Sequence, residues 1–412
     1  MIYKTFFFVD FSGILLYRKD TIFMDLSEEK RKRILIFSLA YAPFVGGAEL
    51  AVKEITDRID NADFDLITLR FDRKWPRKER LGNVNVYRIG GGKLFFPIFA
   101  FCKANRLHKK NPFDLVWSIM ANRAGFAALF FKLRHPEVKY LLTLQEGDPV
   151  DHPFRQMGVL RYFLTRLYRK VFSKADCMQA ISNYLAEWGR NMGVRAEVEV
   201  VPNGVDTKSI KSKVHKVHKV KDKNKKTIIT TSRLVHKNGI DTLIRAVSKL
   251  KLQATSYKLQ ALILGAGPEE QKLKNLAKEL QVEDVVRFLG HVGPEKIPDY
   301  LGQADIFVRP SRSEGLGSSF LEAMGAGLPV IGTRTGGIVD FIKDPEDVGP
   351  NVATGVFAKI DDPEDLAYKI RMLFINDELA GFISRNGKWL VENNYSWDSV
   401  AVRMREIFSK VA

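Results

Sequence analysis

Two glutamates close together in the sequence carry its clearest chemical signal. Glu314 and Glu322 are separated by seven residues in RPSRSEGLGSSFLEAMGAG, and the turn between them contains Gly315, Leu316 and Gly317. A helix that begins after such a turn directs backbone N–H groups at a phosphate. Glu314 could accept hydrogen bonds from a sugar, and Glu322, about two turns along the helix, from the paired hydroxyls of a ribose. The spacing therefore predicts a site for a sugar joined to a nucleotide.

A basic loop earlier in the chain could hold the diphosphate of the same ligand. In TIITTSRLVHKNGID, an apolar strand at 227–231 leads into Arg233, Lys237 and Asn238, and a helix is expected to begin near Ile240. An arginine fork and a lysine beside a helix N-terminus supply fixed positive charge for a diphosphate. In open α/β sheets, ligands bind at the carboxyl ends of the strands, where this loop lies. We therefore predict that Arg233 and Lys237 stabilise the charge of a leaving diphosphate and that Asn238 contributes to binding.

Glycine turns at three more strand ends are expected to complete the site. Gly46 and Gly47 follow the strand ILIFSLA and open a helix, although such a pair is also a common way to make a tight turn. Gly265 ends the strand LILG, and Val292 follows the strand VRFLG. Because turns at the ends of successive parallel strands converge on one crevice, we predict that Gly265 and Val292 flank the nucleotide base.

The elements that must position these residues alternate along the chain. Short apolar runs typical of buried strands are separated by segments with helical periodicity, a pattern that indicates parallel sheets covered by helices. The pattern predicts an α/β protein with two Rossmann-like, doubly wound domains. The expected strands are 34–40, 64–69, 115–119 and 140–144 in the first half, and 227–231, 260–264, 285–289, 306–308 and 329–331 in the second.

Composition marks the domain boundaries. Residues 211–226, KSKVHKVHKVKDKNKK, form a low-complexity run with few core-forming side chains. The aromatic residues Trp389, Tyr395 and Trp397 are expected to anchor a last helical segment as it packs back on the N-terminal domain. The predicted divisions are an N-terminal extension at 1–30, a Rossmann-like acceptor domain at 31–206, a basic linker at 207–226, a Rossmann-like nucleotide-sugar domain at 227–385, and the helical segment at 386–412.

Charge and cysteine content restrict the class of protein. The 412 residues carry a formal net charge of +17, of which +10 belongs to residues 1–206 and +8 to residues 207–226. Cys102 and Cys177 lie far apart, which fits a reducing cytoplasm better than a disulfide-stabilised secreted protein. The apolar stretch at the N-terminus, interrupted by Asp10, is too short to span a bilayer. We therefore expect a cytoplasmic location.

We expect no metal ion, and no cofactor other than the nucleotide-linked sugar that serves as substrate. Asp63 and Asp65 stand at the start of a strand, away from the donor motifs, and are interpreted as surface charge. His215 and His218 lie in the low-complexity run without carboxylate or thiolate ligands beside them. The sequence therefore predicts chemistry that is independent of metal ions.

In its motifs the chain resembles the retaining GT-B glycosyltransferases of the large family 4, which includes many bacterial mannosyl- and glucosyltransferases of cell-surface polysaccharide assembly. The matching motifs are GGAE, ISNYL, VPNGVD, SRLV with KNGID, LGAGP and Glu314-x7-Glu322, in order from about residue 41 to residue 366. The resemblance implies the GT-B fold, in which two domains face each other across a cleft. It also implies transfer of a hexose from a nucleotide diphosphate sugar to a glycan or lipid-linked acceptor. In that family the position of Arg233 binds the diphosphate, Glu314 the donor sugar and Glu322 the ribose.

The chain departs from the family pattern at two places. The family's phosphate-binding lysine directly precedes the glycine of KGID, whereas here Asn238 stands there and Lys237 is one residue earlier. Many relatives place a histidine beside the donor sugar, but the corresponding loop here, TLQEGDPVD, offers Gln145 and Glu146. The resemblance implies front-face attack with retention of configuration, in which the leaving diphosphate accepts the proton and Arg233 and Lys237 stabilise it. Glu146 is the candidate nucleophile for a double displacement.

Other functions stay open at this point. The net charge of +17 allows a nucleic-acid or anionic-surface binding protein, although no recognition motif accompanies it. A sugar-nucleotide epimerase on the same scaffold would share the donor motifs. Residues 152–174, which mix Arg and Lys with Phe and Leu and contain no acidic residue, predict a basic amphipathic helix on an anionic membrane surface. We therefore expect a cytoplasmic glycosyltransferase that is peripheral on the inner face of the membrane and binds no nucleic acid.

Overall fold

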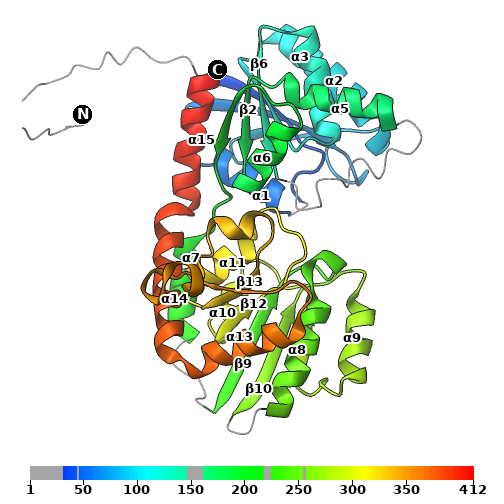
Figure 1. Cartoon of the computed structure of the whole chain (residues 1–412). Coiled ribbons are helices and arrows are strands. Elements are labelled where there is room, and N and C mark those ends of the chain that lie inside the picture. Colours follow the sequence, from blue (N-terminus) through cyan, green and yellow to red (C-terminus); the bar gives the residue numbers. More distant parts are fainter. Residues whose placement is uncertain (1–30, 44–45, 146–160, 218–223, 254–256) are drawn as a thin grey trace, which may run out of the picture. The chain divides into compact units, whose positions relative to one another are not determined.

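Two parallel-sheet α/β domains account for most of the chain (Figure 1). A computed structural model describes residues 31–43, 46–145, 161–217, 224–253 and 257–412. The two-domain α/β architecture expected from the alternation of apolar and helical segments is confirmed.

The N-terminal sheet has eight strands in the order β3-β4-β2-β1-β5-β6-β7-β8. All neighbours are parallel except β3 and β4, which form an antiparallel pair at one edge. The strands are β1 Lys32–Phe37, β2 Ala62–Leu69, β3 Lys78–Leu81, β4 Val84–Ile89, β5 Leu115–Ile119, β6 Lys139–Leu144, β7 Cys177–Ala180 and β8 Glu197–Val200. The helices of this domain are α1 Gly47–Thr56, α2 Gly92–Lys110, α3 Arg123–Arg134, α5 Arg161–Ser173 and α6 Asn183–Asn191.

Alternate residues of the central strand β1 show that helices cover both faces of this sheet. Leu35 and Phe37 are fully buried in a core that also contains residues of α2, α3 and α6. Ile34 and Ile36 are fully buried in a second core together with residues of α1 and α15 (Trp397–Val411). A parallel strand that is buried on both faces has no polar alternation, which explains the continuous apolar run ILIF after Lys32 and Arg33.

The C-terminal sheet has six parallel strands in the order β11-β10-β9-β12-β13-β14. Its central strand β9 precedes the predicted diphosphate loop. The strands are β9 Lys225–Thr231, β10 Lys258–Leu264, β11 Val286–Gly290, β12 Ile306–Val308, β13 Val330–Thr333 and β14 Val356–Ala358. The helices and 3-10 turns are η3 His236–Asn238, α8 Ile240–Gln253, α9 Glu270–Glu279, α10 Ile297–Leu301, α11 Ser318–Gly325, η4 Gly336–Asp340, α12 Pro345–Val348, η5 Pro350–Val352, α13 Pro363–Ile375 and α14 Asp377–Asn394.

The first half of the expected linker is a packed helix. Helix α7 spans Thr207–Val217, and Ile210 and Val214 on it are buried. These two residues are four positions apart, so they share one face of the helix, while Lys211 on another face is exposed. The basic linker expected over 207–226 therefore contains a packed helix in its first part, because two apolar residues among many lysines are enough to bury one helix face. Residues 218–223 lie outside the described part of the chain.

The chain returns to the N-terminal domain between α14 and α15 rather than at residue 386. Val205 pairs with Ser396 in an isolated β-bridge, and the Val205 N–H donates to the Tyr395 carbonyl at 2.8 Å. Tyr395 and Trp397 are buried at this crossing, as expected for anchors. Trp389, in contrast, is exposed on α14, so it does not anchor the segment.

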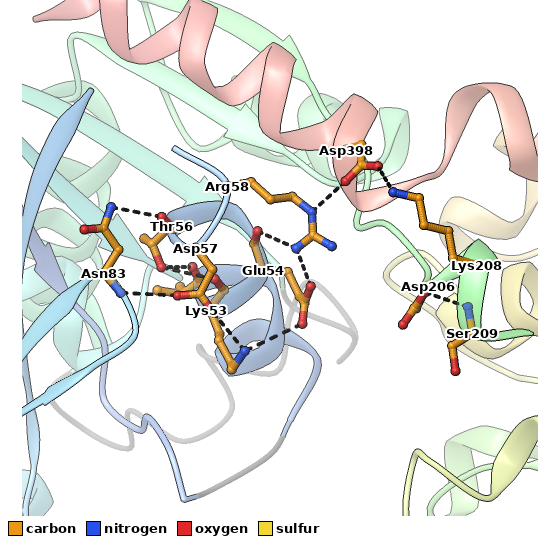
Figure 2. A network of polar contacts seen from close by, with 11 residues as sticks. Lys53, Glu54, Thr56, Asp57, Arg58, Asn83, Asp206, Lys208, Ser209 and Asp398 are labelled. Atoms are coloured by element: carbon orange, nitrogen blue, oxygen red, sulfur yellow. Dashed lines mark hydrogen bonds and ion pairs between the residues drawn. The ribbon is translucent and has the colours of Figure 1, made fainter. Parts of the chain in front are cut away.

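Aromatic contacts and ion pairs fix helix α15 to the N-terminal domain. Phe408 packs edge-on against Trp117 of β5, with ring centroids 5.1 Å apart, and 6.1 Å from Phe64 of β2. Figure 2 shows Asp398 between Arg58, in the turn after α1, and Lys208 of α7, with a contact of 2.9 Å to each. Because both cations reach one carboxylate, the start of α15 connects the turn after α1 to the crossing between the domains.

Candidate functional site

The turn between the two glutamates has the predicted conformation. Gly317 is the N-cap of α11 in a left-handed conformation with φ +94°, and no side chain caps the helix. Gly315 and Leu316 are buried before it, and Glu314 precedes the turn while Glu322 lies on α11 itself. No side chain of the N-cap residue covers the start of α11, and the N–H groups of Ser318 and Ser319 precede that of Phe320, which donates to the Gly317 carbonyl at 2.9 Å. The uncapped helix start can therefore receive an anion.

The two carboxylates have different environments. Burial raises the pKa of the Glu322 carboxyl to about 7, and the positive charge of Arg309 works in the opposite direction and lowers it. Glu322 keeps part of its surface exposed, so a ligand can still reach it. Glu314 forms an ion pair with Arg309. One arginine therefore acts on both carboxylates of the motif.

Arg309 is a site residue that the sequence analysis missed. It follows β12 in the stretch VRPS and is buried. Besides its ion pair with Glu314, its guanidinium donates to Ser319 Oγ at 2.7 Å, to Ser311 Oγ at 3.2 Å and to the Thr231 carbonyl at 3.3 Å. It also lies over the ring of Phe320, 5.2 Å from the centroid. A buried arginine with this many partners holds the loop between β12 and α11 in one shape, and the signal for it was an arginine directly after an apolar strand.

In the loop after β9, the charged residues reach the surface and the asparagine is buried. Arg233 is exposed and Lys237 is partly buried, at the carboxyl end of β9 where the sequence placed them. The buried Asn238 donates through its side-chain amide to the Arg233 carbonyl at 2.7 Å. Asn238 therefore closes the loop that carries Arg233 and Lys237. Its predicted contribution to diphosphate binding would be indirect, by holding these two cations in place.

Hydrogen bonds join the loop of Arg233 to the loop of Glu314. The Lys237 carbonyl accepts from the backbone N–H of Arg312 at 2.6 Å and of Ser313 at 3.4 Å. The Arg312 side chain reaches back to Asp241 on α8, with contacts of 2.8 and 3.0 Å. Burial alone would raise the pKa of Asp241, but the hydrogen bond and charge of Arg312 outweigh it and hold the pKa below its usual value. The predicted diphosphate loop and the first glutamate are thus parts of one hydrogen-bonded unit.

Two glycines allow the other loops to approach this unit. Gly265, at the end of β10, has φ +136°, and an added Cβ would lie 1.8 Å from the Ser232 carbonyl oxygen. Gly336 has φ +52°, and an added Cβ would lie 1.7 Å from the Glu314 carbonyl oxygen. The Gly265 N–H donates to the Gly290 carbonyl at 2.7 Å, two residues before Val292, which is partly buried. The structure therefore brings the turns of Gly265 and Val292 together at the carboxyl edge of the C-terminal sheet.

The glycine pair of the N-terminal domain has an acidic neighbour. Gly46 is the N-cap of α1 without a side-chain cap, and Gly47 begins the helix. Burial raises the pKa of the Glu49 carboxyl, while hydrogen bonds from the backbone N–H groups of Glu49 and Gly46 oppose that rise. Among the described residues, no hydrogen bond or ion pair joins Gly46 or Gly47 to the loops of Arg233 and Glu314. The Glu49 carboxylate therefore accepts hydrogen bonds from some of the backbone N–H groups of this turn. The sequence did not indicate this contact.

Glu146, the candidate nucleophile, lies outside the described residues, so its position stays a prediction. Its neighbour Gln145 accepts a hydrogen bond from the buried Asn203 of VPNGVD at 3.2 Å. In ISNYL, the backbone N–H of Asn183 donates to Asp340 Oδ2 at 2.8 Å, which links α6 of the first domain to η4 of the second. Two of the motifs that the sequence analysis quoted therefore support loops at the carboxyl edge of the N-terminal sheet.

The described residues contain one group of possible metal ligands, His108, His135 and Glu137, whose ligand atoms lie within 4.8 Å of one another. His108 Nδ1 accepts from the Phe113 N–H at 3.0 Å, so the neutral ring carries its proton on Nε2, the atom 3.9 Å from Glu137. A protonated nitrogen does not bind a metal ion, which argues against a site there.

The acidic pair at the start of β2 is only partly surface charge. Asp63 is exposed, but Asp65 is buried, pairs with Arg33 at 2.5 Å and accepts from Asn85 at 3.0 Å. The interpretation of both as surface charge is corrected for Asp65, whose place in the strand turns it toward two partners inside the domain.

The basic segment expected on a membrane surface has its described apolar residues in the core. On α5, Tyr168, Val171 and Phe172 are buried, and Arg169 and Lys170 are exposed. Residues 152–160 and the side chains of 161–164 lie outside the description. The described part of this segment is a helix with an apolar inner face and a charged outer face. The predicted membrane contact through the apolar face of this helix is therefore wrong for its described part. In the described part of the chain, no helix is long and apolar enough to cross a membrane.

Several solved structures share the fold of this chain. Sucrose-phosphate synthase from Thermosynechococcus elongatus aligns with a TM-score of 0.74 at 19% identity, covering 92% of this chain and 99% of that one. The Anabaena protein HepE, solved in complex with UDP and glucose, aligns with a TM-score of 0.72 at 18% identity, covering 92% and 100%. These likenesses show that the chain has the GT-B fold.

Sequence relatives agree with this fold. The GDP-mannose-dependent alpha-(1-6)-phosphatidylinositol monomannoside mannosyltransferase of Mycobacterium tuberculosis is 29% identical over 394 residues, covering 91% of this chain and 97% of its own. A GDP-mannose-dependent monoacylated phosphatidylinositol monomannoside mannosyltransferase of Corynebacterium glutamicum is 32% identical over 254 residues, covering 58% and 63%.

Two family models match consecutive parts of the chain. The model Glycosyltransferase Family 4 matches residues 45–209, and the model Glycosyl transferases group 1 matches residues 211–408. Together they span both domains and include the loops of Arg233, Glu314 and Glu322. The chain therefore belongs to the group 1 (family 4) glycosyltransferases.

Proposed function

We propose that the protein transfers a hexose, with retention of anomeric configuration, from a nucleotide diphosphate sugar to a glycan or lipid-linked acceptor in cell-surface polysaccharide or glycolipid synthesis. The observation that carries the proposal is the hydrogen-bonded unit formed by the loops of Arg233 and Glu314 at the carboxyl edge of the C-terminal sheet. It combines an exposed arginine, a partly buried lysine, an uncapped helix N-terminus and two carboxylates, which are groups that can bind a nucleotide diphosphate sugar.

The donor we propose is GDP-mannose. Support comes from two relatives whose names state GDP-mannose dependence, one of which matches nearly its whole length. Glu322 would accept hydrogen bonds from the ribose hydroxyls, Gly265 and Val292 would flank the base, and Arg233 with Lys237 would contact the diphosphate. These roles require the ionised form of Glu322, since a carboxylate accepts two hydrogen bonds while a protonated acid gives up part of that capacity.

The proposed mechanism is front-face attack without a metal ion. The acceptor hydroxyl attacks the anomeric carbon on the face from which the diphosphate departs, and the diphosphate oxygen takes the hydroxyl proton. Arg233 and Lys237 stabilise the negative charge that grows on the leaving diphosphate, and this stabilisation is larger in the transition state than in the ground state. Glu314, positioned by Arg309, would hold the sugar hydroxyls and so fix the orientation of the anomeric carbon.

A donor screen followed by a product analysis tests this proposal. Thermal unfolding with GDP-mannose, UDP-glucose and UDP-galactose should show stabilisation by one donor, because a ligand at 100 times its Kd adds about 2.7 kcal/mol. NMR of the product should then show the anomeric configuration of the donor, with and without EDTA. Inverted product would refute retention, loss of activity in EDTA would refute metal independence, and conversion of the donor without an acceptor would indicate an epimerase.

A further inference from the structure

Helix α2 of the N-terminal domain is apolar on its outer face as well as on its inner face. Phe96, Ala100 and Ala104 are fully buried, and their spacing of four residues defines the face that packs on the sheet. On the outer face, Leu94 is 74% exposed and Ile98 is 50% exposed. A soluble helix usually covers its outer face with polar side chains, so a second apolar face indicates contact with another apolar phase.

The exposed residues continue onto the neighbouring helix α3. A groove between the two helices is lined by Ile98, Phe101, Phe130, Leu133 and Arg134. Phe101 of α2 meets Phe130 of α3 edge-on, with ring centroids 6.4 Å apart. Leu133 is 54% exposed at the rim of the groove. We call the surface formed by Leu94, Phe95, Ile98, Phe99 and Leu133 together with this groove the α2/α3 surface.

The segment that forms the α2/α3 surface is strongly basic, although Lys132 pairs with Asp176 and Glu137 lies beside His108 at the end of the surface. Asp114 is the single acidic residue between positions 92 and 134, and its carboxylate accepts from the backbone N–H of Arg33 at 2.7 Å. Among the described residues, no carboxylate pairs with Arg106, Lys109 or Arg134. The basic residues of this segment are Lys93, Lys103, Arg106, Lys109, Lys110, Arg123, Lys132 and Arg134. An occupant of this surface must therefore be apolar at its centre and negatively charged around it.

The order of residues along α2 separates two kinds of contact. The exposed apolar residues occupy its first two turns, and Arg106, Lys109 and Lys110 occupy its last turns. A bilayer with anionic lipid offers this arrangement, with acyl chains beside a layer of negative headgroups. A second copy of the chain does not, because two such surfaces face to face would bring their cations together.

We propose that the α2/α3 surface docks the N-terminal domain on a bilayer that contains anionic lipid. Leu94, Phe95, Ile98 and Leu133 enter the boundary between headgroups and acyl chains, and Lys93, Arg106 and Arg134 contact the headgroups. Each basic residue near such a surface strengthens binding about fivefold. The contact is peripheral, and it uses a part of the chain different from residues 152–174.

Topology connects this surface to the active site if the proposed transfer to a lipid-linked acceptor is correct. Helix α2 follows β4, and the glycine pair Gly46 and Gly47 follows β1, and both strands run parallel to β2 between them. The exposed start of α2 therefore lies at the same carboxyl edge of the sheet as the glycine pair. Docking through α2 holds that edge next to the headgroup of a membrane lipid.

Vesicle sedimentation of the full chain tests the docking. Binding of the native protein is measured with phosphatidylcholine vesicles that contain either no phosphatidylglycerol or 30% phosphatidylglycerol, at low and at high salt. The same measurements are made on the double variant Leu94→Asp and Ile98→Asp. The matched control is Leu252→Asp with Ile375→Asp, two residues of the C-terminal domain that are 86% and 70% exposed. We expect salt-sensitive binding to the anionic vesicles alone, at least a tenfold loss of binding in the α2 variant and less than a twofold loss in the control.

A fluorophore on Cys102 gives a second readout at the surface itself. Cys102 is exposed on α2, one turn after Ile98, while Cys177 is buried, so the unmodified protein reacts mainly at Cys102. A blue shift of an environment-sensitive label on addition of anionic vesicles supports the docking. The docking proposal would be overturned by equal binding to neutral and anionic vesicles, or by equal losses of binding in both double variants. It would also be overturned by a label whose emission does not shift, or by a dimer that dissociates on the α2 substitutions. Calorimetric donor binding of the same variants is expected to be unchanged, so failure of the docking is distinguishable from failure of the proposed function.

Discussion

Replacing Arg309 with methionine tests whether one buried cation controls both carboxylates of the donor site. The substitution keeps an unbranched side chain in place but removes the ion pair with Glu314 and the hydrogen bonds to Ser319, Ser311 and the Thr231 carbonyl. It also removes the positive charge that lowers the pKa of Glu322. We expect a less stable protein whose donor binding has a different pH dependence.

The size of the stability change follows from the burial of the pair. The side chains of Arg309 and Glu314 are 8% and 17% exposed. Removing one partner of a fully buried ion pair costs about 3–5 kcal/mol, and partial access of water to Glu314 places this pair at the lower end, about 3 kcal/mol. Arg312→Met is the matched control, because Arg312 pairs with Asp241 and Asp361, which are 30% and 54% exposed. Its removal should cost about 1–2 kcal/mol, since its partners stay hydrated.

Donor affinity as a function of pH separates a positioning role from a merely structural one. If the ionised form of Glu322 binds the ribose, affinity in the native protein should rise with pH through about 7. Without Arg309 the pKa of Glu322 moves further up, so the midpoint of this rise shifts to higher pH, and a smaller fraction of Glu322 is ionised at pH 7. Arg312→Met should leave the midpoint in place, and Arg309→Lys should restore it while affinity stays reduced. A folded Arg309→Met variant with an unchanged midpoint would refute the reasoning.

Three further outcomes are expected. The free energy of unfolding should fall as pH rises from about 4.5 to 7, by up to about 3 kcal/mol, because the raised pKa of Glu322 means that the folded state holds a proton which the unfolded state has released; Glu322→Gln should remove this part of the slope in urea titrations at pH 5 and 8. Arg233→Ala should lower kcat more than it raises the donor Kd, since the leaving-group charge is greatest in the transition state, and equal effects on both constants would contradict that role. Phe408→Ala should cost about 3–5 kcal/mol of unfolding free energy, because Phe408 is buried against Trp117 and Phe64, while Val402→Ala on the exposed side of α15 should cost under about 1 kcal/mol.

Most of the two sheets could be predicted from apolar runs. The strands expected at 115–119 and 306–308 match β5 and β12, and those expected at 227–231 and 260–264 end where β9 and β10 end. A central parallel strand is buried on both faces, so it appears in the sequence as a continuous apolar run. Strands with an interrupted or very short apolar run were not expected. Strand β8 reads EVEV, in which polar and apolar residues alternate at the edge of the sheet, β4 reads VNVYRI, and β14 is only the three residues VFA.

The motif residues of the site could be predicted because each depends on local sequence. A glycine turn after a strand and before a helix fixes the place of Glu314 and Glu322, and the structure keeps that order. Arg309 could not be found in this way, because its partners come from β9, from the following loop and from α11, and only folding brings them together. The same applies to Asn238, whose amide closes its own loop, and to Glu49, whose carboxylate meets the Gly46 N–H.

Errors about α7 and α5 have a common cause. Their many lysines and arginines predict a basic linker at 207–226 and an amphipathic helix on a membrane surface at 152–174. In both segments a few apolar residues at helical spacing, such as Ile210 and Val214, bury one face while the long cationic side chains cover the other. Composition alone does not show whether the apolar residues of a basic helix lie in the core or at the surface. The structure does show this for α2, whose outer face has exposed apolar residues.

Calorimetric titration with GDP-mannose tests the central claim most directly, that the unit of Arg233, Glu314 and Glu322 binds a nucleotide diphosphate sugar. The native protein should bind one equivalent, and Glu322→Ala should weaken binding by about 1.5–3 kcal/mol, roughly ten- to hundredfold, because the ribose hydroxyls lose a charged acceptor. A folded Glu322→Ala variant that binds the donor as tightly as the native protein would contradict the account.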